Sequence, residues 1–176
     1  MKWNEVIQRV MFIYDHREGV TYCLGCAGEV AGRDDIVRRQ FIYYYDHGWK
    51  EKIGEGIPDW VSTDNAARTW EKWLKINRGK MCFDCSGLIC WACGYEGRHV
   101  WSSWNLGNME REESPSAGVA GSVLWKSGHV GLDIGYGYEM EIGSYNNTVE
   151  FHKISDRGWV RSCYIDGIDY AGADAR

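Results

Sequence analysis

A short segment in the middle of the sequence places a cysteine where a helix should begin. The segment reads Cys82-Phe83-Asp84-Cys85-Ser86-Gly87-Leu88, in which Asp84 can cap a helix that starts near Cys85. The unpaired backbone N–H groups and the dipole at a helix start favour an anion, so this position should lower the pKa of the thiol. Cys85 is therefore a candidate nucleophile. The competing interpretation is a buried structural cysteine, because free cysteine is often a core residue.

A nucleophilic thiol needs a base, and the sequence offers five histidines. Four of them are interpreted as solvated or as satisfied core groups: His16, His47, His99 and His152. The fifth opens an alternating segment, Gly128-His129-Val130-Gly131-Leu132-Asp133-Ile134-Gly135. In a strand, the apolar side chains of this segment point to one face and the imidazole of His129 points to the other. His129 is thus the candidate base.

The residues that follow His129 supply a carboxylate for it. A turn at Gly135-Tyr136-Gly137 would fold the next segment back as a hairpin. Pairing symmetric about Gly135 places residue 141 across from residue 129, so Glu141 could face His129. A carboxylate there would fix the imidazole tautomer and favour the imidazolium. Glu139 lies on the same side and is the less central candidate.

The elements that must position these residues fall into two groups. Helical periodicity predicts helices over residues 1–15, from Asp34 or Asp35 to Tyr45, and from Ser62-Thr63-Asp64 to about Ile76. Glycine-separated β-type runs then cover 121–125, 129–135, 138–143, 148–154 and 159–165. Helices followed by antiparallel strands predict an α+β fold. The 176 residues predict a single domain.

Composition excludes several classes of function. The net charge of −5 with dispersed acidic residues gives no basic footprint for nucleic acid. The N-terminus has no apolar signal region, and no run of about 18 apolar residues follows, so synthesis in the cytoplasm without a signal peptide and no membrane insertion are expected. Seven cysteines, an odd number, favour reduced thiols.

Four ordered elements together resemble a known family. Phe83-Asp84-Cys85-Ser86-Gly87-Leu88, then Gly128-His129-Val130-Gly131, then a polar residue at 141, are similar to the motifs of NlpC-type cell-wall cysteine peptidases. The earlier segment Gly19-Val20-Thr21-Tyr22-Cys23-Leu24-Gly25 is similar to the Gly-x-x-Tyr-x-x-Gly element of that family. The chain therefore resembles this family over residues 19 to 143.

The resemblance implies a papain-like α+β fold in which the nucleophile helix packs on an antiparallel sheet. It implies hydrolysis of amide bonds in peptidoglycan stem peptides, commonly next to D-γ-glutamyl and diamino-acid residues. By position, Cys85 would be the nucleophile, His129 the base and Glu141 the orienting carboxylate, with the Tyr22 hydroxyl at the oxyanion site. Asp84 and Ser86 would help to bind the free amine or main chain of the substrate. No metal or organic cofactor is expected.

Three departures from the family pattern affect the expected groove and role. Glu141 stands where histidine is more common, and Cys26 stands where a second glycine is usual. A helical insertion over 29–80 carries Trp49, Trp60, Trp70 and Trp73. The longer chain resembles bacteriophage-type lysins, which would act on the cell wall after release.

Two alternatives use the Cys-x-x-Cys pairs Cys23/Cys26, Cys82/Cys85 and Cys90/Cys93. Two such pairs can hold zinc in a metal-stapled binding module, which metal analysis would detect. The pair at the helix start could instead be a redox dithiol, although no βαβ pattern precedes it. A third alternative keeps the triad but makes the enzyme a thiol acyltransferase or amidase.

Overall fold

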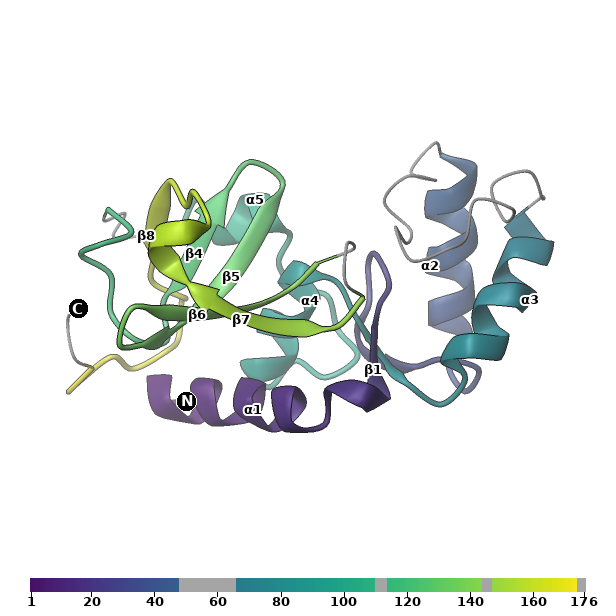
Figure 1. The fold of residues 1–176 in the computed structure, drawn as a ribbon, viewed down its shortest axis with the longest axis horizontal. Helices are drawn as coiled ribbons and strands as arrows, with labels where there is room; N and C mark the ends of the chain where they lie inside the picture. The colour runs from purple at the N-terminus through teal and green to yellow at the C-terminus, as the bar shows by residue number, and fades with distance from the viewer. Residues whose placement is uncertain (48–65, 110–113, 144–146, 174–176) are drawn as a thin grey trace.

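The computed structural model describes residues 1–47, 66–109, 114–143 and 147–173. The helix start predicted at Ser62-Thr63-Asp64 and the insertion residues Trp49 and Trp60 lie outside the described residues. Within the described part, helices and sheets are segregated as the sequence predicts, and the α+β prediction is confirmed (Figure 1).

The larger sheet contains the second half of the chain. Its five strands lie in the order β7-β6-β5-β4-β8, and every neighbouring pair is antiparallel. The bounds are β4 (Val123–Lys126), β5 (His129–Gly135), β6 (Tyr138–Ile142), β7 (Val149–Lys153) and β8 (Arg161–Cys163). Four of these strands lie inside a predicted β-type run and β4 extends one residue beyond its run, because period-two alternation marks strands that bury one face.

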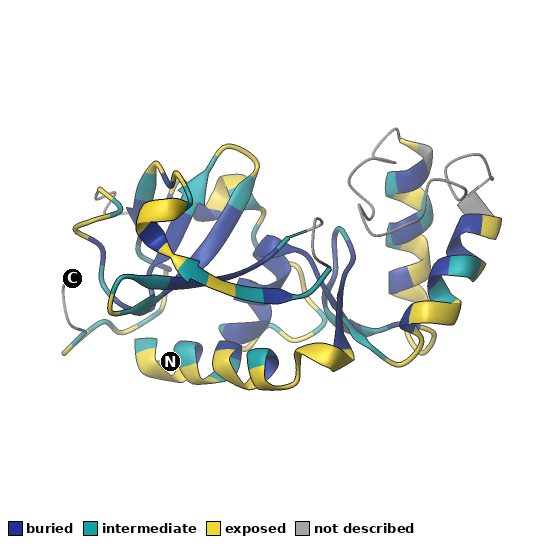
Figure 2. Cartoon of the chain, in the orientation of Figure 1, coloured by how far each residue is buried: buried dark blue, intermediate teal, exposed yellow. Residues whose placement is uncertain are grey.

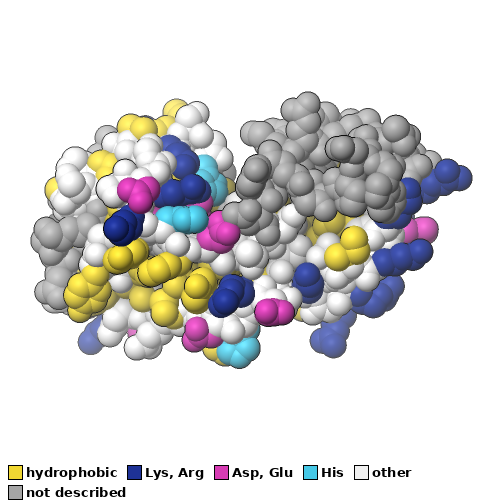
Figure 3. Space-filling model, in the orientation of Figure 1, with side chains coloured by type: hydrophobic (Ala, Val, Ile, Leu, Met, Phe, Trp, Pro, Cys, Tyr) yellow, Lys and Arg dark blue, Asp and Glu magenta, His cyan; other side chains and the backbone are white. Residues whose placement is uncertain are grey.

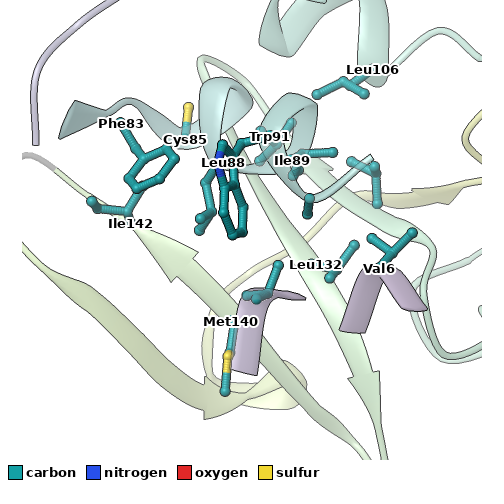
Figure 4. Close-up of a cluster of buried hydrophobic side chains, with 14 of the residues drawn as sticks. Val6, Phe83, Cys85, Leu88, Ile89, Trp91, Leu106, Leu132, Met140 and Ile142 are labelled. Atoms are coloured by element: carbon teal, nitrogen blue, oxygen red, sulfur yellow. The ribbon is translucent and has the colours of Figure 1, made fainter. Parts of the chain in front are cut away.

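Two helices cover one face of this sheet. Helix α4 (Cys85–Ala92) contacts β5 and β6, and α1 (Trp3–Asp15) contacts α4 and β7. Helix α1 buries Val6, Val10 and Ile13 at helical spacing and leaves Met11 exposed. The buried residues of α1, α4 and the sheet form one apolar cluster (Figures 2 and 4). The core therefore holds the start of α4 against the sheet.

A smaller sheet was not predicted from the sequence. Its strands are β1 (Val20–Tyr22), β2 (Ala27–Val30) and β3 (Met81–Phe83), in the order β1-β3-β2. Strand β1 runs parallel to β3, and β2 runs antiparallel to it. The start of the predicted helical insertion at residue 29 is therefore wrong, because β2 continues to Val30. Strands this short give too few residues for periodicity to register.

The insertion itself is helical on both sides of the undescribed segment. Helix α2 (Asp35–Asp46) packs on α3 (Ala66–Asn77) at the end of the molecule away from the larger sheet (Figure 1). The ring of Phe41 lies 5.4 Å, between centroids, from the rings of both Trp70 and Trp73. These residues belong to a second apolar cluster, which also contains Cys23, Cys26 and Cys82.

Short helical elements complete the fold: η1 (Arg17–Gly19), α5 (Ser103–Leu106) and η3 (Ile154–Asp156). None of the helices in the described ranges has both the length and the apolar character needed to cross a membrane.

Candidate active site

Asp84 fixes the start of helix α4. Its Oδ1 accepts hydrogen bonds from the backbone N–H of Gly87, at 2.7 Å, and from the Ser86 hydroxyl, at 3.0 Å. Its Oδ2 accepts a hydrogen bond from the backbone N–H of Gly25, also at 2.7 Å. The predicted N-cap is therefore present, and the same buried carboxylate ties the loop before β2 to the helix.

The loop approaches α4 so closely that residue 87 must be glycine. A Cβ atom at Gly87 would overlap the backbone carbonyl of Cys26, whose oxygen also accepts a hydrogen bond from the N–H of Asp84 at 3.0 Å. The sequence Asp84-Cys85-Ser86-Gly87 thus combines a helix cap, a thiol in the first turn and a residue small enough for loop contact.

The Cys85 thiol lies between the start of α4 and strand β5. The side chain is buried, and its sulfur points away from the apolar side chains that face the sheet (Figure 4). Burial and the charge of Asp84 raise the pKa of Cys85 to about 12, although backbone amides of Val130, Ser86 and Cys85 lower it. The expectation of a lowered thiol pKa is wrong, because the rise caused by the loss of hydration is larger than the lowering caused by the amides at the helix start.

His129 and Glu141 are in contact on the larger sheet. The Nε2 atom of His129 lies 2.5 Å from Oε2 of Glu141. The predicted register is wrong, because Leu132 pairs with Met140 and the turn consists of Tyr136 and Gly137, both with positive φ. Glu141 therefore lies two residues short of the position across from His129 and contacts the imidazole diagonally.

Trp159 covers the imidazole of His129. The two rings are stacked, with 5.7 Å between centroids and 16° between planes. The ammonium of Lys126 lies 4.5 Å from the Trp159 ring, and Arg157 forms an ion pair with Glu141. Burial, then Lys126 and Arg157, lower the pKa of His129 to about 4. The imidazole is therefore neutral at neutral pH, with Nδ1 left free of the Glu141 contact.

The remaining predicted site residues surround the thiol. Tyr22 ends β1 directly beside Phe83 of β3 and is buried in the same cluster as Cys85. Burial raises the pKa of the Tyr22 hydroxyl, and the charges of Cys85 and Asp84 raise it further, as expected for a phenol close to both groups. Ser86 is buried and bonded to Asp84. The structure thus brings Tyr22, Asp84, Ser86 and Cys85 together at one end of α4.

His99 is a neighbour of this group that the sequence analysis missed. Its Nε2 lies 2.9 Å and 3.0 Å from the two carboxylate oxygens of Asp84 and 3.1 Å from the Ser86 hydroxyl. Burial acts to lower the pKa of His99, but the hydrogen bond and charge of Asp84 outweigh it and raise the pKa. No periodic pattern surrounds His99, so only the folded chain connects it to the site.

The cysteine pairs do not form the alternative sites. All seven cysteines are free thiols. Cys82 belongs to the helical cluster whereas Cys85 belongs to the sheet cluster. Across the described ranges, the potential metal ligands that converge are Glu139, Glu141 and His152, and no group of three includes a cysteine. The zinc-stapled module and the redox dithiol are therefore not favoured.

The site is built on an antiparallel sheet with the thiol-bearing start of α4 packed on it, which is an α+β arrangement. Among solved structures, the peptidoglycan hydrolase RipB from Mycobacterium tuberculosis matches with a TM-score of 0.50 and 18% identity, covering 93% of this chain and 67% of that chain. The P60 domain of an antigen from M. avium subspecies paratuberculosis matches with a TM-score of 0.49 and 16% identity, covering 93% and 96% of the two chains. No family model and no curated protein matches the sequence. The likeness to RipB shows a shared fold, as the sequence predicts.

Proposed function

We propose that the chain is a cysteine endopeptidase that hydrolyses amide bonds in peptidoglycan stem peptides. The observation that carries the proposal is the partly buried contact between His129 and Glu141, at 2.5 Å, on the strand that continues with Val130 against the thiol in the first turn of α4. The backbone amide of Val130 forms a hydrogen bond with the Cys85 thiol. Because Val130 follows His129 in β5, this contact connects the strand that carries the base to the helix that carries the thiol. A thiol, an imidazole and a carboxylate in this order can perform acyl transfer.

The chemistry starts from a neutral thiol and a neutral imidazole. His129 Nδ1 takes the proton of Cys85 as the sulfur attacks the carbonyl carbon of the substrate. Glu141 then stabilises the imidazolium, and the backbone N–H of Cys85 and the Tyr22 hydroxyl stabilise the oxyanion. The imidazolium protonates the leaving amine as the C–N bond breaks. Water, deprotonated by the same imidazole, hydrolyses the thioester and restores the thiol.

Asp84 and Ser86 form the polar end of the proposed groove. Asp84 is buried and already accepts four hydrogen-bond donors, so it is fixed in place before substrate arrives. The negative charge of a carboxylate held in this way would attract a substrate with a free amine, such as a stem peptide cut next to a D-γ-glutamyl or diamino-acid residue. A role as a phage-type lysin, acting on the cell wall after release, belongs to this proposal.

The test is digestion of purified peptidoglycan followed by mass spectrometry of the released fragments. Wild type and Cys82→Ser should release new peptide termini, and Cys85→Ser should release none. Cys82→Ser is the matched control, because it removes a buried cysteine of the other cluster three positions away. Glu141→Gln should reduce kcat by roughly 10²- to 10⁴-fold, since it removes the carboxylate behind the base.

The mass of each fragment also identifies the cut bond. Termini at a D-γ-glutamyl or diamino-acid residue support the stem-peptide specificity, and external addition to living cells tests the lysin role by loss of turbidity. Equal fragment release by wild type and Cys85→Ser would contradict the proposed nucleophile. Absence of release from peptidoglycans of several cross-link types would contradict the proposed function.

A further inference from the structure

Three potential metal ligands lie on the face of the larger sheet that carries His129. Glu139 of β6 pairs directly with His152 of β7, and Glu141 follows on the same face of β6. One ligand atom from each of these side chains lies within 4.8 Å of the others. Figure 3 shows histidine, acidic and basic side chains side by side on the sheet half of the molecule. The strand register alone therefore brings two carboxylates and an imidazole to one point.

The bonding of Glu139 is incomplete within the described part of the chain. Its side chain has 0% exposure, yet neither carboxylate oxygen has a hydrogen-bond partner there. The Nε of Arg157 lies 3.7 Å from Oε1, which is an ion-pair distance and too long for a hydrogen bond. Within the same described part, the Nε2 of His152 makes no hydrogen bond, although it lies at ion-pair distances from Oε2 of Glu150, 3.3 Å, and from Oε1 of Glu141, 3.7 Å. Buried polar groups are nearly always bonded, so these atoms have unused capacity directed at a shared point.

We propose that Glu139, Glu141 and His152 bind a divalent transition-metal ion of the Zn²⁺ type. Two carboxylate oxygens and one imidazole nitrogen form a donor set that suits Zn²⁺, with a fourth position for water. Mg²⁺ and Ca²⁺ prefer sites made of oxygen donors alone, so the imidazole favours the transition metals.

Arg157 is the group that a metal ion must displace. Its guanidinium forms ion pairs with both Glu139 and Glu141, and 32% of its side chain is exposed. The side chain can therefore turn outward to water while a doubly charged ion takes its place. Removing this competitor should strengthen metal binding.

Metal binding should oppose catalysis, an inference that rests on the proposed function. Glu141 contacts His129 through Oε2, so a metal ion on Glu141 competes for the carboxylate that would stabilise the imidazolium. The ion would inhibit from the side of Glu141 that faces away from His129, and the Cys85 thiol would not be one of its ligands.

The experiment is titration of the full chain with Co²⁺, monitored by visible absorption and isothermal calorimetry in a phosphine reductant. Wild type should bind about one ion without the thiolate charge-transfer band that cysteine ligands give. Glu139→Gln and His152→Gln should each weaken binding about 10- to 100-fold, and Arg157→Gln should strengthen it. Glu96→Gln and His16→Gln are the matched controls, because both alter exposed residues on other elements.

Several outcomes would overturn the site. They are no binding by wild type or by Arg157→Gln, a charge-transfer band showing cysteine ligands, and affinities unchanged in Glu139→Gln and His152→Gln. Circular dichroism checks the fold of each variant, and Arg157→Gln still tests the site if the other two fail to fold. Zn²⁺ should inhibit peptidoglycan hydrolysis by wild type at concentrations about tenfold lower than for His152→Gln. Metal binding without any hydrolysis would support the site and reject the proposed function instead.

Discussion

At the scale of single residues, the pKa of the Cys85 thiol lies well above 7 and that of the His129 imidazole well below 7, so both groups are uncharged at neutral pH. Burial and Asp84 raise the pKa of the thiol to about 12, and burial with Lys126 and Arg157 lowers that of the imidazole to about 4. Iodoacetamide reacts with the thiolate, so alkylation of Cys85 should be slower at pH 7 than that of glutathione. The rate should rise about tenfold per pH unit into the alkaline range.

Mass spectrometry of the Cys85 peptide measures this rate separately from the other cysteines. Glutathione under the same conditions is the reference, and Cys85→Ser confirms the peptide assignment. A rate that is high and constant from about pH 5 to pH 8 would contradict the prediction, because it would show a stable thiolate–imidazolium pair.

His99 should stabilise the fold in a pH-dependent way. Asp84 raises the pKa of His99 above its ordinary value of 6.5, against the effect of burial. The charged imidazole therefore contributes stability that is complete below about pH 6.5 and is lost as pH rises through the raised pKa. His99→Asn should reduce the free energy of unfolding most in acid and least in alkali. Urea unfolding at a series of pH values measures this difference in the free energy of unfolding, with His16→Asn as an exposed control. A deficit that does not change with pH would contradict the prediction.

At the scale of elements, the fit between α4 and the loop before β2 depends on Gly87. A Cβ there would overlap the Cys26 carbonyl, so Gly87→Ala must shift the loop or the helix. We expect a loss of about 1–3 kcal/mol in the free energy of unfolding. Gly19→Ala is the control, because a Cβ at Gly19 meets no atom within 4 Å. Equal unfolding midpoints for the two variants in urea would show that the contact is unimportant.

The sequence predicts those elements whose signals are local. The cap at Asp84 and the alternation through β5 identify the helix start that carries Cys85 and the strand that carries His129. The register of the hairpin depends on the turn, and Tyr136 takes a positive φ that its residue type does not indicate. Long-range partners such as His99 and Trp159 have no local signal, because only tertiary packing brings them to Asp84 and His129.

At the scale of the whole molecule, two large apolar clusters meet at the segment that carries Cys85, the proposed nucleophile. Cys82 belongs to the cluster under α2 and α3, and Cys85 belongs to the cluster between α4 and the larger sheet. The cap at Asp84 lies between these two residues and is bonded to the loop from Cys23 to Cys26 through Gly25. The position of the thiol therefore depends on both cores, although the proposed catalytic groups lie in only one.

This division predicts that the helical cluster can open while the sheet stays folded. Phe41→Ala removes a ring packed on Trp70 and Trp73, which should cost roughly 3–5 kcal/mol. Local opening would then expose the buried thiols of Cys23, Cys26 and Cys82 to maleimide. The thiol of Cys163, in the sheet cluster, should keep its protection.

Labelling followed by peptide mass spectrometry measures each thiol separately. Tyr43→Ala is the control on the same helix, since that ring is 54% exposed and its loss leaves the buried cluster complete. Faster labelling of the three insertion-side cysteines in Phe41→Ala alone would show that the two cores open independently. Equal acceleration at Cys163 would show one cooperative unit, in which case loss of α2 packing would reach the thiol of Cys85 as well.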